Sequence, residues 1–240
     1  MNCARDRNDL QMKTIKENLF RKIRAFTLIE LLVVIAIIAV LAALMIPLAA
    51  GALLKQRINR AMTEMAQLDT AIDSYKAARG HFPPDNPNNY ARPQLFYELT
   101  GTYFQQRNPP RTFVRLKGID QLPQATVQAA FGVDGFVNTS LTENVNPEAL
   151  KQLEVRDFFS TLKNSQFLGT NYNGVTVYFI GLPMDGLNEI LSPEGRRLTP
   201  WHYNSSNPTN NPESFDLWVD IILRGKTNRI CNWSATPIVL

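Results

Sequence analysis

The sequence predicts an α+β protein, in which a long N-terminal α-helix packs against a small C-terminal α/β domain with an antiparallel sheet. Three observations predict this fold class. Residues 31–54 carry no charged side chain. Residues 55–79 space their apolar side chains three and four apart, as an amphipathic helix does. After Gly80, short apolar stretches alternate with turn-rich ones, as in a small domain built around a sheet.

The composition bounds the size and class of the protein. With 240 residues, 45% hydrophobic and 19% charged, the chain can form one ordinary domain plus an appendage. Its formal net charge of +4 comes largely from cations before Ala25, which lie beside an apolar run and not along a face with aromatic residues, so we expect no nucleic-acid partner. Cys3 and Cys231 lie on opposite sides of that run, so no intrachain disulfide is expected, and Cys231 is expected to be a small buried side chain.

The uncharged run from Leu31 to Leu54 is predicted to span a membrane. As a helix rising ~1.5 Å per residue it is long enough to cross roughly 30 Å of hydrocarbon. It is apolar on every face, whereas a helix at the edge of a soluble core would show a polar stripe. A cleavable secretory signal, with its site near residues 49–51, would have a shorter run. Cations before the run predict a cytoplasmic N-terminus, with the remainder outside the inner membrane.

A family resemblance begins at the start of this run. Residues 24–35, Arg-Ala-Phe-Thr-Leu-Ile-Glu followed by apolar residues, resemble the cleavage and methylation site of type IV pilins and type II secretion pseudopilins. The resemblance implies that prepilin peptidase cuts between Ala25 and Phe26 and methylates the new amino group of Phe26. Residues 1–25 would then be a cytoplasmic leader, starting at Met1 or Met12. The family usually has Gly where this chain has Ala25, so we expect slower cleavage.

Glu30 and Pro47 are the two unusual residues of the run. Glu30 is the only charged residue between Arg24 and Lys55, and a carboxylate in hydrocarbon is costly. The resemblance implies that Glu30 pairs with the freed amine of Phe26 in another copy and sets the subunit register; alternatively, Glu30 reaches headgroup water at the cytoplasmic interface. Pro47 removes a backbone hydrogen bond and is expected to bend or loosen the helix. In the family the helix is thought to melt near this proline, although prolines are also tolerated in ordinary membrane helices.

The amphipathic continuation, residues 55–79, is expected to enter the domain at residues 80–240. Met62, Met65 and Leu68 are expected to pack against a sheet, and Gly80 to stop the helix. Residues 75–83, in which an aromatic and Pro follow this Gly, also resemble pseudopilins. Further elements are predicted by residue pattern: a short helix at 93–99, strands at 111–116 and 175–180, a helix at 147–162 capped by Asn146, a polar loop at 204–211, and a last strand at 215–223.

The C-terminal part resembles the major pseudopilin of type II secretion. The matching pieces are Pro200-Trp201, residues 214–218 and Asn232-Trp233. In that family an acidic, Gly-rich loop between the last two pieces binds calcium. Here Asp216 and Asp220 are followed by three cations, and calcium wants six to eight oxygen ligands. A calcium site at Asp216 and Asp220 is therefore disfavoured, no cofactor is expected, and both aspartates are expected to face solvent from a strand.

Catalytic motifs are hard to find in the sequence. His81 and His202 are the only histidines, and HExxH, GxSxG and phosphate-binding motifs are missing. His81 lies in the helix-ending turn, His202 is expected to pack as an aromatic ring, and Glu154 and Asp157 are expected on a solvated helix face. We therefore expect a structural filament subunit and not an enzyme; the alternative is a signal-anchored periplasmic enzyme or binding protein.

The resemblance also implies the partners of such a subunit. They are prepilin peptidase, other copies of the chain, other pseudopilins, an inner-membrane assembly platform and the lipid membrane. The subunit would be a single-pass inner-membrane protein with a periplasmic domain before it enters a filament. Type II secretion, a type IV pilus and a competence-like filament all share the N-terminal motif, and only the C-terminal resemblance favours secretion.

Overall fold

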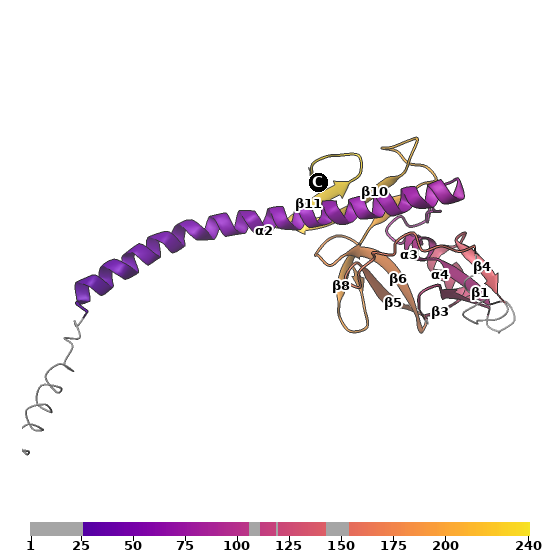
Figure 1. Cartoon of the computed structure of the whole chain (residues 1–240), viewed down its shortest axis with the longest axis horizontal. Coiled ribbons are helices and arrows are strands. Elements are labelled where there is room, and N and C mark those ends of the chain that lie inside the picture. Colours follow the sequence, from indigo (N-terminus) through magenta and orange to yellow (C-terminus); the bar gives the residue numbers. More distant parts are fainter. Residues whose placement is uncertain (1–25, 106–110, 119, 143–153) are drawn as a thin grey trace, which may run out of the picture. The chain divides into compact units, whose positions relative to one another are not determined.

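The computed structural model describes residues 26–105, 111–118, 120–142 and 154–240, without the side chains of residues 45–50 and 142. The chain divides into two compact units, Met1–Leu53 and Leu54–Leu240. One helix, α2 (Leu28–Arg79), contributes residues to both units (Figure 1). It continues through Pro47, so the structure shows no break at that residue.

The second half of α2 forms one wall of the core of the domain Leu54–Leu240. Five of its buried apolar residues are separated by three or four positions: Ala61, Met65, Leu68, Ile72 and Tyr75. This confirms the predicted amphipathic stripe. The helix ends where predicted, because Gly80 adopts a φ of +84°, which favours glycine, and its N–H donates to the Lys76 carbonyl at 2.8 Å.

The described residues of the domain form three four-stranded sheets and two short helices (Figure 1). The first sheet has the order β3 (Gln121–Pro123), β2 (Thr112–Arg115), β1 (Thr102–Gln105), β4 (Thr139–Thr142). The second has the order β5 (Phe167–Tyr172), β6 (Val175–Leu182), β8 (Arg197–Pro200), β7 (Ile190–Leu191). The third has the order β12 (Ile238–Val239), β11 (Lys226–Cys231), β10 (Asp216–Leu223), β9 (His202–Asn204). The helices are α3 (Leu95–Thr100) and α4 (Gln124–Phe131).

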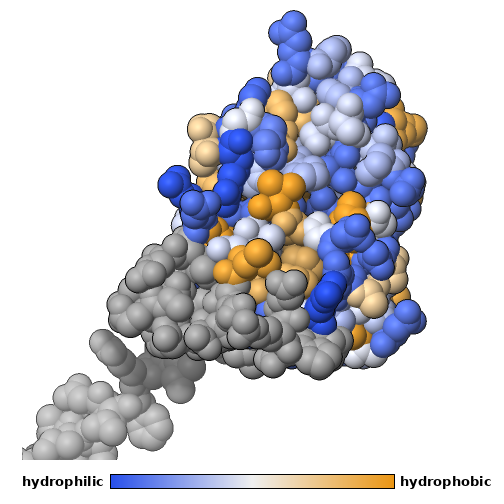
Figure 2. Space-filling model, turned by 90° about the vertical axis from the view of Figure 1, so that its right-hand side faces the viewer, coloured by the Kyte–Doolittle hydropathy of each residue, from blue (hydrophilic) through white to orange (hydrophobic). Residues whose placement is uncertain are grey.

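The pairing of these strands confirms the predicted α+β class. Neighbouring strands pair antiparallel, except that β1 and β4 run parallel. The predicted strands at 111–116, 175–180 and 215–223 correspond to β2, β6 and β10, and the predicted helix at 93–99 corresponds to α3. The view in Figure 2 shows a surface on which hydrophilic residues predominate and hydrophobic ones are scattered in small groups.

A buried carboxylate connects α2 with the first sheet. Glu98 in α3 is fully buried. Its Oε2 accepts hydrogen bonds from the Tyr75 hydroxyl (3.0 Å) and the Asn138 N–H (2.9 Å), and its Oε1 accepts one from the Val137 N–H (2.8 Å). Burial raises the pKa of the Glu98 carboxyl despite these bonds. The carboxyl group is satisfied, and it ties α2 to the segment that leads into β4.

The segment after α2 is fixed by residues much later in the chain. Asp85 Oδ2 accepts hydrogen bonds from the N–H groups of Ser205 (2.9 Å) and Ser206 (3.0 Å) and from the Ser206 hydroxyl (2.8 Å). The Pro83 carbonyl accepts bonds from the hydroxyls of Tyr203 and Ser205, both at 2.9 Å. The exit of the helix is therefore held by β9 and the turn that follows it.

The helix predicted at 147–162 is wrong in its described part. Residues 146–153, including the expected cap Asn146, lie outside the described residues, and residues 154–162 form bends and turns without a helix. Asp157 accepts a bond from the Phe159 N–H (3.0 Å) and pairs with Lys117 (2.8 Å), so it does not lie on a solvated helix face. The Asn138 side chain also donates to the Arg156 carbonyl (2.7 Å). Contacts with distant residues replace the local helix here.

Candidate functional site

The N-terminus of α2 is closed by a reciprocal pair of hydrogen bonds between Thr27 and Glu30. The Glu30 Oε2 accepts from the Thr27 N–H (2.9 Å) and hydroxyl (2.8 Å), while the Glu30 N–H donates to Thr27 Oγ1 (3.3 Å). This is a capping box, in which the two residues satisfy donors that the first helical turn leaves free. Sequence reasoning missed it, although Thr-x-x-Glu before an apolar run is its signature.

Beyond the capping box, α2 exposes apolar side chains in all directions. The large apolar residues between Phe26 and Leu44 are 43% to 82% exposed, with Val34 the least and Leu28 the most exposed. Taking the described residues alone, no helix combines the length and the apolar character that a membrane crossing requires.

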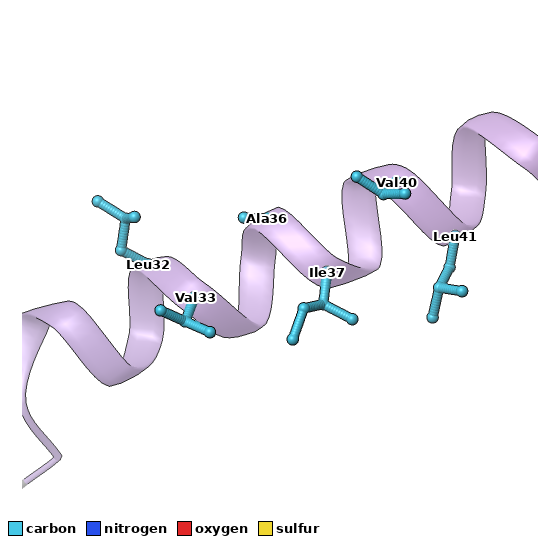
Figure 3. Close-up of a pocket in the computed structure, with 6 residues that line it drawn as sticks. All are labelled: Leu32, Val33, Ala36, Ile37, Val40 and Leu41. Atoms are coloured by element: carbon cyan, nitrogen blue, oxygen red, sulfur yellow. The ribbon is translucent and has the colours of Figure 1, made fainter.

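One face of this helix carries a shallow apolar groove (Figure 3). It is lined by two rows of side chains at four-residue spacing, Leu32, Ala36 and Val40 on one side and Val33, Ile37 and Leu41 on the other. Residues four apart form a ridge along a helix, and a ridge of another helix fits the groove between two such rows. The small Ala36 side chain leaves space in the middle of one row, so the groove has the form of a surface for helix packing.

The structure describes only part of the predicted processing site. Ala25 lies outside the described residues, and the Phe26 side chain is 71% exposed just before α2. Pro47 lies inside α2, but its side chain is not described. Cleavage, methylation, the pairing of Glu30 with another subunit and the loosening at Pro47 therefore stay predictions.

Asp216 is buried and does not face solvent, which corrects the sequence prediction. Its carboxylate accepts hydrogen bonds from the backbone N–H groups of Thr209 (2.8 Å), Asn210 (3.0 Å) and Asn211 (2.8 Å) and from the Asn210 side chain (3.0 Å). Burial acts to raise the pKa of the Asp216 carboxyl, but these bonds hold it below its usual value. Asp216 thus orders the loop before β10.

Asp220 is buried as well, with 4% of its surface exposed, and its partner is a cation. Arg229 on β11 lies directly opposite and donates from Nε to Oδ1 and from Nη2 to Oδ2, both at 2.8 Å. The bonds that the Arg229 guanidinium donates to Asp220 raise the pKa of that guanidinium. The carboxylate oxygens of both aspartates thus accept hydrogen bonds from nitrogen donors of the chain. Within the described ranges no group of three His, Cys, Asp or Glu residues could hold a metal ion, and the residues present do not fit calcium.

The two histidines and Cys231 have the packing roles that the sequence suggested. His202 is buried and stacks on Trp218 with ring centroids 5.0 Å apart, and burial lowers its pKa to about 4. His81 lies edge-on to Tyr75 after the end of α2. Cys231 is a buried free thiol, and burial raises its pKa.

Comparisons with known proteins found one family model and two relatives that match part of the chain. Residues 20–46 match the model of the prokaryotic N-terminal methylation motif. The chain is 42% identical over 65 residues to the type II secretion system core protein G of Escherichia coli (strain K12), a match that covers 27% of this chain and 45% of that protein. It is 43% identical over 112 residues to the fimbrial protein EcpB of Eikenella corrodens, which covers 46% of this chain and 70% of that protein.

The comparison with solved structures gave no match. The chain thus spans under half of the length of one relative and 70% of the other. The chain itself carries the methylation motif, an N-terminal helix and a C-terminal β-rich domain. On these grounds, the chain belongs to the type IV pilin-like family, which includes pilins and type II secretion pseudopilins.

Proposed function

We propose that this chain is the structural subunit of a filament, a pseudopilin or pilin that assembles through the first half of α2. The observation that carries the proposal is the exposure of apolar side chains all round this helix, at 43% or more. Such a surface is unfavourable in water and needs either lipid or other helices around it. The groove in Figure 3 gives a neighbouring helix a place to pack.

Before assembly, we propose, lipid covers this surface. The uncharged run in the sequence continues through residues 45–50 to Leu54, which gives it the length of a membrane span. Cations before the run favour a cytoplasmic N-terminus, so the domain Leu54–Leu240 would lie in the periplasm. The subunit would be a single-pass protein of the bacterial inner membrane.

Processing would produce the mature N-terminus. We propose that prepilin peptidase cuts between Ala25 and Phe26 and methylates the Phe26 amine, as the methylation motif at residues 20–46 supports. The new amine would lie next to the Thr27–Glu30 capping box. Only Oε2 of Glu30 takes part in that box, so Oε1 can accept a bond from the Phe26 amine of a neighbouring subunit while the cap stays closed.

The relatives leave two kinds of assembly open, because one is named as a secretion-system core protein and the other as a fimbrial protein. The C-terminal sequence pieces favour secretion. The proposed partners are prepilin peptidase, further copies of the chain, other pseudopilins and an inner-membrane assembly platform. We propose a structural role and no catalysis, since the histidines serve packing and the buried carboxylates of Glu98, Asp216 and Asp220 serve structure.

Site-specific cross-linking tests the proposal in membranes. A photoreactive residue at Ile37, in the groove, should form a ladder of oligomers in cells that also contain an assembly platform. The same residue at Leu141, which is 69% exposed on β4, is the matched control for a surface apolar position outside the groove. Monomers alone from Ile37, together with an uncleaved leader, would contradict a filament subunit and favour an anchored enzyme or binding protein.

A further inference from the structure

The turn between β10 and β11 holds an arginine in a conformation that disfavours it. The strand register leaves Arg224 and Gly225 as a two-residue loop, with φ of +51° and +73°. Two positive φ angles are typical of a type I′ turn, which favours Asn-Gly. The β5–β6 turn of the same domain has that sequence, Asn173-Gly174, with φ of +51° and +85°. An exposed cation is therefore kept at the β10–β11 turn at a cost in backbone strain.

Exposed apolar side chains lie next to this cation. Ile222 pairs with Thr227, and the Leu240 N–H donates to the Thr227 carbonyl at 3.0 Å. Directly paired residues point to the same side of a sheet, so the three share the face that looks away from the core. Ile222 is 38% and Leu240 59% exposed, and Lys226 beside the turn is exposed too. Cations mixed with apolar side chains are typical of surfaces that bind the membrane interface.

The turn lies at the end of the domain where α2 enters. β10 begins beside the other end of α2, because the Phe215 ring lies 5.1 Å from that of Phe82. Its eight residues then extend for about 25 Å. In the view of Figure 1, β10 and β11 overlap α2, and the C-terminus is marked toward the end where the helix enters the domain. Leu54 and Ile58, on the part of α2 that enters the domain, pack on its core.

Further cations come from α2 at the same end. Lys55 and Arg57 are exposed, and Arg60 is paired with Glu64 at 2.8 Å. One exposed acid, Asp185, is close, since its carbonyl accepts from the Ile222 N–H. None of the described ion pairs involves the other four cations at this end, which are Lys55, Arg57, Arg224 and Lys226. The entry-end patch is thus cationic and partly apolar, and consists of Lys55, Arg57, Arg224, Lys226, Ile222 and Leu240.

We propose that the entry-end patch docks on an anionic phospholipid surface, that of the membrane which holds the subunit before assembly. The inference rests on the membrane anchoring proposed above. The uncharged run ends at Leu54, so Lys55 and Arg57 emerge within one turn of the headgroups, and the β10–β11 turn at the same end of the domain meets them too. The contact would orient the domain and be given up on entry into the filament.

Photo-cross-linking from the full chain in vesicles tests the proposal. A photoreactive residue at Ile222 should form lipid adducts in vesicles of phosphatidylcholine mixed with phosphatidylglycerol, and few in phosphatidylcholine alone. The control position is Leu141, whose side chain is 69% exposed. It belongs to β4, a strand that lies toward the other end of the domain in Figure 1. It should give few adducts in either vesicle.

The double variant Arg224→Asn, Lys226→Gln separates charge from folding. Asn is the favoured residue at this φ, so the variant should fold at least as well, but its lipid adducts should fall about fivefold for each cation lost, since a cation at an anionic surface contributes about 1 kcal/mol. Equal adducts from variant and wild type, or adducts to a second copy in place of lipid, would overturn the docking proposal. Carbonate extraction distinguishes failure of the anchoring from failure of the docking. If carbonate extracts the chain from the vesicles, the anchoring is refuted as well. If the chain stays in the vesicles but forms no lipid adducts, only the docking is refuted.

Discussion

Arg229 holds both carboxylate oxygens of Asp220 with two hydrogen bonds of 2.8 Å, across the β10–β11 pair. The guanidinium also lies 5.6 Å from the centre of the Trp218 ring. The planar Arg229 guanidinium thus binds both oxygens of the carboxylate that the sequence analysis considered as a calcium ligand. This pairing of Asp220 with a cation of the chain is the basis for expecting that this end of the domain folds without calcium.

Thermal unfolding should not depend on calcium. The fragment should span Leu54–Leu240, because the buried stripe of α2 belongs to the core and a fragment from Gly80 would lack it. Melts with excess calcium and with chelator should coincide. An ion that binds only the folded state would raise the midpoint, so a rise of several degrees with calcium would show that the carboxylates do bind it.

The mature protein should begin at Phe26 with an N-methyl group. The methylation motif at residues 20–46 is the basis of this expectation. Mass spectrometry of the first tryptic peptide, from cells with an active prepilin peptidase, measures it directly. Ala25→Gly should speed leader removal, since Gly is the usual residue before the cut. Recovery of peptides that span Ala25–Phe26, and of no others from this region, would refute the prediction.

Glu30 should serve assembly more than membrane insertion. In Glu30→Leu the chain should still insert and lose its leader, because an apolar residue suits hydrocarbon better than a carboxylate. Filaments should be lost, because the Phe26 amine of the neighbouring subunit would have no counter-charge. Membrane fraction, leader cleavage and sheared filaments are compared with those of the wild type.

Thr27→Val is the matched control for this experiment. It removes the hydroxyl that pairs with Glu30 and should cost about 1 kcal/mol of helix capping, while it leaves the carboxylate in place. We expect this variant to assemble. If Thr27→Val stops assembly as completely as Glu30→Leu does, the capping box is what assembly requires. If both variants assemble normally, the proposed contact between Glu30 and another subunit is wrong.

Asp69 should lower the stability of the domain as the pH rises. Burial, and then the nearby charge of Asp73, raises the pKa of Asp69 from 3.8 to about 6. Between these values the folded state binds more protons than the unfolded state, so the free energy of unfolding falls as pH rises from about 4 to 6. Asp69→Asn should therefore gain about 1–2 kcal/mol over the wild type at pH 7 and little at pH 4. Denaturant titrations of both proteins measure the difference, and a gain that does not change with pH would contradict it.

His202 should lower the stability of the domain as the pH falls, which is the opposite of the effect of Asp69. Burial lowers its pKa from 6.5 to about 4, so the unfolded state binds more protons between these values and stability is lost as the pH falls. His202→Gln removes this titration. The stability advantage of the wild type over His202→Gln should shrink by about 2–3 kcal/mol from pH 7 to pH 4. A constant difference across this interval would mean that His202 is not held neutral by its buried site.

The elements that the sequence predicted well are those whose pattern is set by a single buried face. The stripe through Leu68 and Tyr75 needed only helical spacing, and Gly80 ended the helix as a residue suited to its positive φ. The β10 strand was visible as an apolar run. The expectation that Asp216 and Asp220 face solvent was wrong, because the strand pattern could not show that a loop and Arg229 cover these carboxylates.

The helix predicted near residue 147 failed for a related reason. Asn146 and Pro147 are good local starting signals. In the described residues from 154 onward, however, Asn138 and Arg79 bind backbone carbonyls and Lys117 binds the Asp157 side chain. Such contacts depend on the tertiary structure and leave no trace in local propensity. The capping box, in contrast, was readable from Thr27 and Glu30 alone.

The hydrogen bonds between the segment after α2 and the end of β9 also have a consequence for the order of folding. The bonds from Tyr203 and Ser205 to Pro83 and Asp85 join residues about 120 positions apart. Since a chain is synthesised from its N-terminus, the helix exists long before the residues that fix its exit, and contacts of such sequence separation form late. A chain cut short before Tyr203 would keep α2 but would lack the bonds that fix the exit of this helix. Fixing of the helix exit should therefore be a late step in the folding of the domain.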